Sequence, residues 1–308
     1  MGTVARLSHS TVSDLLDLCA YRVGLNKIVG LDRPTNGRLA VGTAYHAAIE
    51  MHEHTRRAWR RYGGTKGAED GVPVDTMLEA ARTALALEDV EWEDDDLTLT
   101  DAIGMVEAAV THWYETPIPD GQAGAGGSLR DRVLGWQPIA VETWWDLWLP
   151  PDTSLPIRGA CDCVYLKPDG TLVVVDHKSA NRFGKWRLDA EGIRDQAAMY
   201  VLAAKLSPKL PVWRDVMPEF EYHIARTETG KTARFEGARV VQVDVDQVDL
   251  DYVQDRVGSA HLQVLEDRWD KNPDAWICTP KWCPFHQDAG GPCDPHAPNE
   301  YDIAAYVD

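Results

Sequence analysis

The sequence lacks any apolar segment that could cross a bilayer, although it contains 308 residues. Such a segment needs about 20 mostly apolar residues in a row. The first ten residues, MGTVARLSHS, also lack the apolar stretch of a signal peptide. Arg6 occupies the position where an N-myristoylation pattern requires serine or threonine. We therefore expect no membrane partner and a location in the bacterial cytoplasm, or in the host cytoplasm if this is a phage protein.

Positive charge is scarce as well. The chain has 31 lysines and arginines against 49 aspartates and glutamates, which gives a net charge of −18. This balance argues against a simple nucleic-acid coat protein, because such proteins are usually basic. It does not exclude an enzyme, since a groove can be locally basic and a bound divalent cation adds positive charge at a site.

Two short groups of basic residues are exceptions to this scarcity. In one segment, Arg182, Lys185 and Arg187 alternate with Phe183 and Trp186. This pattern is typical of phosphate and base contacts, or of aromatic side chains that pack on a core. The second group is predicted as a basic patch on the helix expected at about 42–60, and it comprises Arg56, Arg57, Arg60 and Arg61.

The six cysteines do not form a pattern of disulfides. In a reducing cytoplasm such a framework is not expected. Cys161 and Cys163 are predicted to be buried core thiols. For the C-terminal group, Cys278, Cys283 and Cys293, metal ligation or simple burial is the better interpretation.

Hydrophobic periodicity predicts helices first and a sheet later. Ser10 is the predicted N-cap of a first helix, with Val12, Leu15, Leu16 and Cys19 on one face. A Gly- and Pro-rich connector at 117–130 separates the N-terminal helices from the strands. The remaining predicted elements are helices at 42–60, 77–87, 102–113, 191–205 and 248–268, and strands at 139–149, 157–166, 171–178, 219–226 and 239–245.

This order predicts one α/β domain over residues 1–308. Its parts are a helical N-terminal elaboration (1–130), which carries Cys19 and His46, an α/β core (131–247), and a C-terminal helix with a Cys-rich tail (248–308).

Three charged residues stand on two predicted neighbouring strands. Pro168-Asp169-Gly170 is a turn signal, so the strands at 157–166 and 171–178 should pair as a hairpin. Because side chains alternate faces along a strand, this hairpin can present Asp162, Asp176 and Lys178 on one side. Asp176 follows an apolar run typical of a buried strand, where a charge needs a partner or a function.

Two carboxylates in this arrangement would bind a hard divalent cation, Mg²⁺ or Mn²⁺, through oxygen. The cation would polarise a scissile phosphate and help to generate hydroxide from water. Lys178 would orient that water or stabilise charge on the phosphate. The main-chain carbonyl of His177 could supply a further ligand. Asp-X-Lys alone is common, so an ordinary charged surface hairpin is the alternative.

Three further residues are candidates for the same site. Gln196 and Tyr200 lie four positions apart and share a face of the predicted helix. They could hold a nucleotide backbone or orient Lys178, or simply form a helix surface. His46 is a candidate metal ligand, although a lone histidine on a helix usually is not one.

In combination, these segments resemble the RecB-like nucleases of the PD-(D/E)XK superfamily. The resemblance rests on four motifs in order: Gly42-Thr-Ala-Tyr-His46, Gly159-Ala-Cys-Asp162, Asp176-His-Lys178 and Gln196-Ala-Ala-Met-Tyr200. It implies a restriction-endonuclease-like core, in which a mixed central sheet is flanked by helices.

The resemblance also implies roles for individual residues. His46, Asp162 and Asp176 would be metal ligands, Lys178 the catalytic lysine, and Gln196 and Tyr200 an accessory motif. Glu142 matches a glutamate often seen in this family, with a less defined role.

An iron–sulfur branch of this family includes the CRISPR-adaptation exonucleases, the AddB nuclease domain and related phage exonucleases. By resemblance to it, Cys19 would join Cys278, Cys283 and Cys293 around a [4Fe–4S] cluster. The spacing departs from the branch, because four residues separate Cys278 from Cys283 and nine separate Cys283 from Cys293. An alternative ligand set includes His286, and zinc is then an alternative metal.

The function implied is that of a single-domain, metal-dependent DNA nuclease, most simply an exonuclease acting on DNA ends or single strands. DNA would be its main partner, with recombination or CRISPR-adaptation proteins as possible others. The alternatives are a non-catalytic nucleic-acid-binding or scaffold subunit that retains the fold, and a non-nuclease metalloprotein in which only the Cys-rich tail has a role.

Overall fold

The computed structural model describes residues 4, 6–31, 36–63, 68–90, 92, 97–150, 155–183, 191–210, 216–228 and 237–297. The chain divides into two compact units. The first, which we call the sheet unit, comprises Thr35–Trp145 and Ala160–Asp249. The second, the terminal unit, comprises Met1–Pro34, Asp146–Gly159 and Leu250–Asp308. The prediction of a single domain over 1–308 stays a prediction.

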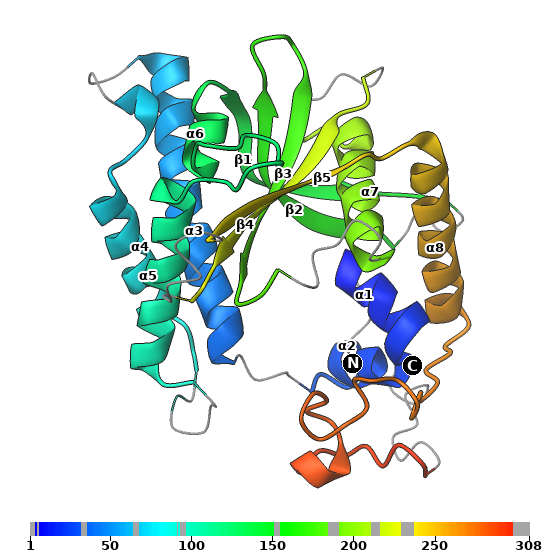
Figure 1. Cartoon of the computed structure of the whole chain (residues 1–308). Coiled ribbons are helices and arrows are strands. Elements are labelled where there is room, and N and C mark those ends of the chain that lie inside the picture. The colour runs from blue at the N-terminus through cyan, green and yellow to red at the C-terminus, as the bar shows by residue number, and fades with distance from the viewer. Residues whose placement is uncertain are drawn as a thin grey trace. The chain divides into compact units, whose positions relative to one another are not determined.

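A five-stranded mixed sheet, in the order β1-β2-β3-β4-β5, forms the centre of the sheet unit (Figure 1). Its strands are β1 (Gln137–Leu147), β2 (Ile157–Leu166), β3 (Leu172–Ala180), β4 (Glu219–Arg226) and β5 (Ala238–Val243). β3 pairs antiparallel with β2 and parallel with β4, and β5 pairs antiparallel with β4. The parallel pair requires a crossover connection, which contains the helix α7 (Glu191–Leu206). The predicted mixed sheet flanked by helices is therefore confirmed.

The β2–β3 hairpin forms where the turn signal predicts it. Gly170 has a φ of 89°, a conformation that glycine adopts without a Cβ penalty. The Asp169 Oδ1 atom accepts a hydrogen bond of 2.9 Å from the Thr171 amide. Leu166 faces Leu172 across the turn, and Cys163 faces Val175 further along the hairpin. Asp162 and Asp176 are the residues that adjoin the Cys163–Val175 pair on β2 and β3.

Three long helices, α3 (Gly37–Tyr62), α4 (Val74–Ala86) and α5 (Leu99–Glu115), build the main hydrophobic core with one face of the sheet. Asn36 caps α3, and a capping box of Thr98 and Asp101 begins α5. The core joins apolar side chains of these helices to the inner strands: Val41, Tyr45, Val106, Trp113, Cys163, Val173 and Val175. Burial of Cys163 in this core agrees with its prediction as a core thiol.

Two predictions for this unit are wrong in detail. The end of the predicted flexible connector begins a short helix, α6 (Leu129–Leu134), because Ser128 and Asp131 form a capping box. Arg56 does not belong to a basic surface patch, since its side chain is fully buried. It pairs with Glu53 and donates to the carbonyls of Val133, Leu134 and Trp136.

The terminal unit contains α1 (His9–Ser13), a π-helix (Asp14–Leu18), α2 (Ala20–Lys27) and most of α8 (Gln247–Leu265). The N-cap of α1 is Ser8 instead of Ser10, because the Ser8 hydroxyl accepts from the Thr11 amide. Cys19 is not on the predicted helical face. It is an extended residue (φ −158°, ψ 103°) between the π-helix and α2. In the part of the chain that the structure describes, no helix combines the length and apolar character needed to cross a membrane.

Candidate metal centre and cysteine cluster

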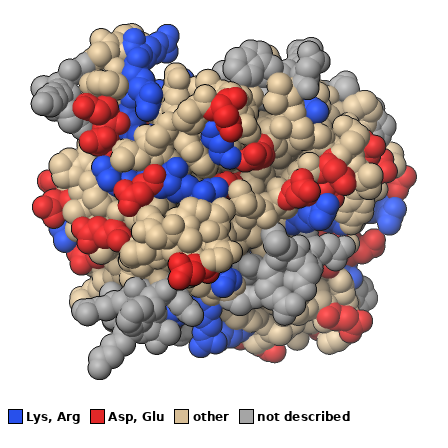
Figure 2. All heavy atoms as spheres, turned by 45° about the horizontal axis from the view of Figure 1, so that its top comes forward, with Lys and Arg blue, Asp and Glu red and all other residues tan. Residues whose placement is uncertain are grey.

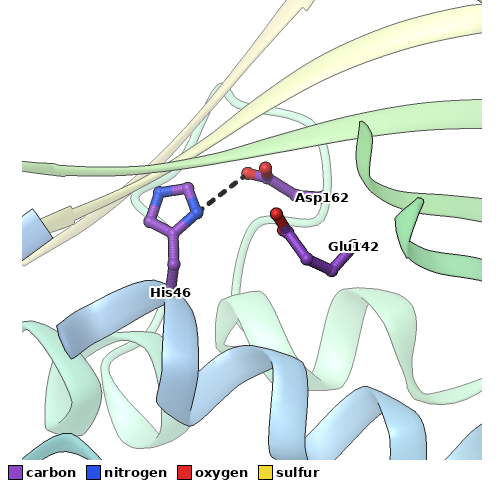
Figure 3. A group of neighbouring side chains, drawn as sticks. All are labelled: His46, Glu142 and Asp162. Carbon is purple, nitrogen blue, oxygen red and sulfur yellow. Dashed lines mark ion pairs between the residues drawn. The ribbon is translucent and has the colours of Figure 1, made fainter. Parts of the chain in front are cut away.

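Three side chains from separate elements converge in the sheet unit: His46 from α3, Glu142 from β1 and Asp162 from β2 (Figure 3). One ligand atom from each lies within 4.8 Å of the other two. His46 Nδ1 is 3.4 Å from Asp162 Oδ2. The three residues also line one small pocket, together with Glu50 and His177. A nitrogen and two carboxylate oxygens at this spacing form a donor set suited to one divalent cation.

Local structure explains how two of these side chains reach the site. On α3, Tyr45, Ala48 and Ile49 are buried in the core, which places His46 at the edge of the buried face. Within β1, Glu142 has a φ of 40°, in the left-handed region that residues with a Cβ seldom adopt. Such a backbone conformation persists only where the surrounding structure fixes it, and it is frequent at functional sites.

Asp176 and Lys178 lie beside this cluster on β3. Asp176 is only 1% exposed, and its Oδ2 atom is 2.6 Å from Lys178 Nζ. The carboxylate of Asp162 interacts electrostatically with both residues. It also accepts a 2.7 Å hydrogen bond from the His177 amide. The structure thus brings together the two aspartates and the lysine that the strand pattern predicts on one side of the hairpin.

The pKa values of these groups reflect burial and like charges. Burial raises the pKa of Glu142 to about 7, and the neighbouring Asp162 carboxylate adds to this effect. Burial, followed by repulsion from Asp162, raises the pKa of Asp176 to about 6, although Lys178 opposes the shift. Burial also acts to raise the pKa of Asp162, but the His46 ring and Lys178 hold it well below its usual range. Lys178 acts on Asp162 and Asp176, and the His46 ring acts on all three carboxyl groups. A divalent cation would balance the remaining negative charge.

α7 contributes the predicted pair Gln196 and Tyr200. The Tyr200 ring packs against Trp145 and Phe220. Gln196 Oε1 accepts a 3.3 Å hydrogen bond from the Tyr222 hydroxyl, which also donates to the Ile193 carbonyl.

Tyr222 is a residue that the sequence analysis missed. It lies directly opposite Asp176 in the β3–β4 register, so both share the sheet face that α7 contacts. The parallel pairing that puts it there requires knowledge of the strand order, which periodicity alone does not provide.

His177 points its ring to the opposite face of the sheet. The ring is buried between Trp113 and His223. Burial, with repulsion from His223, lowers the pKa of His177 well below its ordinary value. The ring is therefore neutral and belongs to the core, while the main-chain amide of the same residue holds Asp162.

A second cluster of ligand-type side chains occupies the terminal unit. Cys19, Cys278, Cys283 and Cys293 line one small cavity, together with His286 and Arg22. Main-chain hydrogen bonds fold the tail back on itself, from the Cys293 amide to the Phe285 carbonyl (2.6 Å) and from the Gln287 amide to the Cys293 carbonyl (2.8 Å). The wide spacing between Cys283 and Cys293 is thus accommodated in a loop that returns to the cavity.

Arg22 is the second residue that the sequence analysis missed. It is 7% exposed, and its Nε and Nη1 atoms have no hydrogen-bond partner among the described residues. Its Nη2 atom lies 3.9 Å from Asp14 Oδ2. Burying a cation is costly unless negative charge lies nearby. Its electrostatic effect lowers the pKa of Cys283, although burial of that thiol raises the pKa more. A positive side chain of this kind fits a cavity that holds thiolates.

A family model described as the PD-(D/E)XK nuclease superfamily matches residues 6–287. The chain therefore belongs to the PD-(D/E)XK nuclease superfamily. The match extends over both clusters of side chains except for Cys293. No curated protein matches the chain.

Two solved structures are similar to this chain. One is a protein from Eubacterium rectale named "Putative exonuclease", which is 12% identical, with coverage of 89% of this chain and 87% of that chain and a TM-score of 0.48. The other is the protein SSO0001, which is 10% identical, with coverage of 86% of this chain and 91% of that chain and a TM-score of 0.28.

Proposed function

We propose that this protein is a metal-dependent DNA nuclease, and specifically an exonuclease that acts on DNA ends or single strands. The observation that carries the proposal is the convergence of His46, Glu142 and Asp162 beside the Asp176–Lys178 pair. Membership of the nuclease superfamily supports the reaction class, and the intact carboxylates and lysine support activity over a purely structural role.

The donor set of this site fits Mg²⁺ or Mn²⁺. His46, Glu142, Asp162 and Asp176 would hold the cation, and the main-chain carbonyl of His177 is a further candidate ligand. When bound, such a cation supplies Lewis-acid stabilisation of the charge that develops on the scissile phosphate.

The chain's own side chains supply positioning and charge. Lys178 has a raised pKa, because Asp176 and Asp162 outweigh the opposing effect of burial, so its amine is charged at neutral pH. It can donate hydrogen bonds to a phosphate oxygen or orient the attacking water. Tyr222 holds Gln196 towards the same face of the sheet, and Gln196 with Tyr200 can align the phosphodiester backbone for hydrolysis.

The terminal unit supports a second proposal, a [4Fe–4S] cluster held by Cys19, Cys278, Cys283 and Cys293. A tetrahedral zinc with bonds of about 2.3 Å places its sulfur ligands about 3.8 Å apart. Among the described residues, no three from these cysteines and His286 have ligand atoms that all lie within 4.8 Å of one another. This wider spacing and the buried Arg22 favour the larger, negatively charged cluster. Zinc with His286 as a ligand is the alternative.

Digestion of end-labelled single-stranded and duplex DNA with Mg²⁺ or Mn²⁺ tests the nuclease proposal. We expect the wild-type protein to release mononucleotides or short products from ends, and Asp176→Ala and Lys178→Ala to lose at least about 100-fold in rate. Arg82→Ala, a change at an exposed ion pair on α4, is the matched control. Wild-type protein that binds DNA without cutting it would instead support a non-catalytic nucleic-acid-binding or scaffold subunit.

Anaerobic purification followed by absorption spectroscopy and metal analysis tests the cluster. A brown protein with about four irons and four sulfides per chain supports [4Fe–4S]. A colourless protein with stoichiometric zinc would contradict the [4Fe–4S] proposal and support a zinc site. If recombination or CRISPR-adaptation proteins are partners, as the resemblance implies, co-purification with the tagged chain will identify them.

A further inference from the structure

The sheet face that carries Asp176 and Lys178 continues onto β4 and β5. Lys178 is opposite Ile224 in the β3–β4 register, and Ile224 is opposite Arg239 in the β4–β5 register. Residues opposite each other in a register share a face, so Arg239 lies on the same face as Lys178. The two are separated by two strand spacings, about 10 Å. That distance corresponds to roughly three nucleotide rises of a stacked strand.

Arg239 is accompanied by an aromatic ring from the segment after β3. Its Cζ atom lies 4.9 Å from the centre of the Phe183 ring. The Cζ atom of Arg226 lies 5.7 Å from the centre of the same ring. Arg226 also donates to the Asn181 carbonyl and pairs with Glu228. The first of these bonds holds the segment 181–183, which carries the ring.

Arg239 itself differs from Arg226 in its contacts. It has no ion pair with any residue in the described part of the chain, and its side chain is half-buried. It also lines a hollow of about 310 Å³ along the outer edge of β5, next to Gln122 and Gln242. A guanidinium that packs near an aromatic ring and has no ion pair with a described residue suits bidentate recognition of a phosphate.

From these contacts we propose that Arg239 and Phe183 form a nucleic-acid subsite, in which Arg239 binds a backbone phosphate and Phe183 stacks against a base two to three nucleotides from the scissile bond. Arg226 positions the ring. This subsite rests on the proposed nuclease function, because it describes where the substrate strand lies beyond the scissile bond.

The hollow beside β5 fits a nucleic-acid strand better than an added peptide strand. β5 is an edge strand, which could in principle pair with another strand. The Val240 amide already donates to Gln122 Oε1 at 3.1 Å, so one hydrogen-bonding position of that edge is occupied. Proteins that bind single-stranded nucleic acids combine positively charged side chains, which contact the backbone, with aromatic rings, on which the bases stack.

Binding of a fluorescein-labelled oligothymidylate, followed by anisotropy with Ca²⁺ at several salt concentrations, tests the subsite. We expect Arg239→Gln to raise Kd about 10-fold and to reduce the slope of log Kd against log salt by about 0.7, the loss of one phosphate contact. Arg239→Lys keeps the slope. Arg82→Gln, at an exposed ion pair on α4, is the matched control and leaves both unchanged.

Phe183→Leu separates stacking from charge. It should raise Kd several-fold for the intact oligonucleotide but leave the salt slope unchanged, and its effect should disappear on an oligonucleotide with abasic sites at the contacted positions. In turnover with Mg²⁺, Arg239→Gln should raise KM with kcat within about two-fold of wild type, which a folding defect would not produce.

Two outcomes overturn the subsite: wild-type affinity and salt slope in Arg239→Gln, or an equal loss in Arg82→Gln. Absence of any binding by the wild-type protein overturns it as well. Binding that depends on Arg239 in a protein that does not cut DNA would support the subsite while the nuclease proposal fails, because the anisotropy assay does not require hydrolysis.

Discussion

At the scale of single residues, Glu142 shows how the candidate site stores unfavourable energy. Its carboxyl group is partly buried beside Asp162, and its backbone has a positive φ. Both features cost stability in the absence of a bound cation. A functional role explains why the fold retains such an arrangement, since a cation at the His46–Glu142–Asp162 cluster would offset the repulsion.

Replacing Glu142 by glutamine tests this interpretation. The folded pKa of Glu142 is raised to about 7 from 4.5, so the ionised carboxylate destabilises the fold at pH 8. We expect Glu142→Gln to raise Tm by a few degrees in EDTA. The stabilisation that Mg²⁺ or Mn²⁺ gives the wild type should also disappear. Differential scanning calorimetry measures both effects, with Glu107→Gln on α5 as the control. An unchanged response to the cations would remove Glu142 from the ligand set.

His52 gives a pH-dependent prediction in the core of the sheet unit. Its ring is fully buried between Trp113 and Tyr114 and donates through Nδ1 to the Val72 carbonyl. Burial lowers its pKa to about 3, so the folded protein binds fewer protons than the unfolded chain below pH 6.5. Stability should therefore fall as the pH drops from about 6.5 towards 3.

Urea unfolding at pH 7.5 and pH 5.5 measures this effect. Between these values the wild type should lose about 1 kcal/mol more unfolding free energy than His52→Gln, because a single histidine with this shift contributes that amount. Other buried histidines titrate in both proteins and cancel in the comparison. Equal losses in the two proteins would show that His52 is not held neutral.

At the scale of elements, the loop before α4 illustrates a close approach that only glycine permits. Gly71 has a φ of 85°, and a Cβ atom there would lie 2.3 Å from the His52 ring. Since His52 is fixed by α3 and by its hydrogen bond to Val72, the ring cannot move aside without breaking the core. The loop is thus fitted to a specific side chain of α3.

Gly71→Ala should destabilise the protein by about 3 kcal/mol, the sum of backbone strain and overpacking. Gly170→Ala, in the β2–β3 turn, is the matched control, because its φ is 89° but nothing lies within 4 Å of the added Cβ. The control should cost about 1 kcal/mol, from the backbone alone. Chemical denaturation measures both values, and a cost for Gly71→Ala no greater than that of the control would contradict the predicted clash.

At the scale of the whole molecule, the charge pattern agrees with an enzyme more than with a coat protein. Lysine and arginine are interspersed with aspartate and glutamate on the face shown in Figure 2. With a net charge of −18, no general attraction to DNA is expected, so the proposed DNA binding would depend on a few specific contacts. Bound cations and individual residues such as Lys178 and Arg239 are the candidates for those contacts.

The terminal unit should depend on its cysteine cluster for stability. It draws on three separate chain segments, and a bound group would link Cys19 to the tail. We expect Cys293→Ser to lower the content of iron or zinc and to reduce hydrogen-exchange protection in α2 and residues 277–293, while α3 stays protected. Cys163→Ala, in the core of the sheet unit, should leave the metal content unchanged. Full metal content in Cys293→Ser would exclude Cys293 as a ligand.

Much of the fold was predictable because local patterns and tertiary structure agree. β2 and β4 have the predicted bounds, and α7 and α8 differ by only a few residues. The helix at α6 was missed because it is short and follows a glycine-rich segment. Of the basic-aromatic segment, Lys185, Trp186 and Arg187 lie outside the described residues, whereas Phe183 contacts Arg239, which is distant in sequence.

By itself, the sequence determined the strand alternation and the turn at Gly170, and these place Asp162, Asp176 and Lys178 on one side of a hairpin. Those properties depend on neighbours along the chain, so periodicity is sufficient to derive them. Only the tertiary structure decided that Glu142 reaches Asp162, that Tyr222 lies opposite Asp176, and that Arg22 faces the cysteines. Those contacts depend on strand order, a positive φ and the return path of the tail, which join residues far apart in sequence and leave no local pattern.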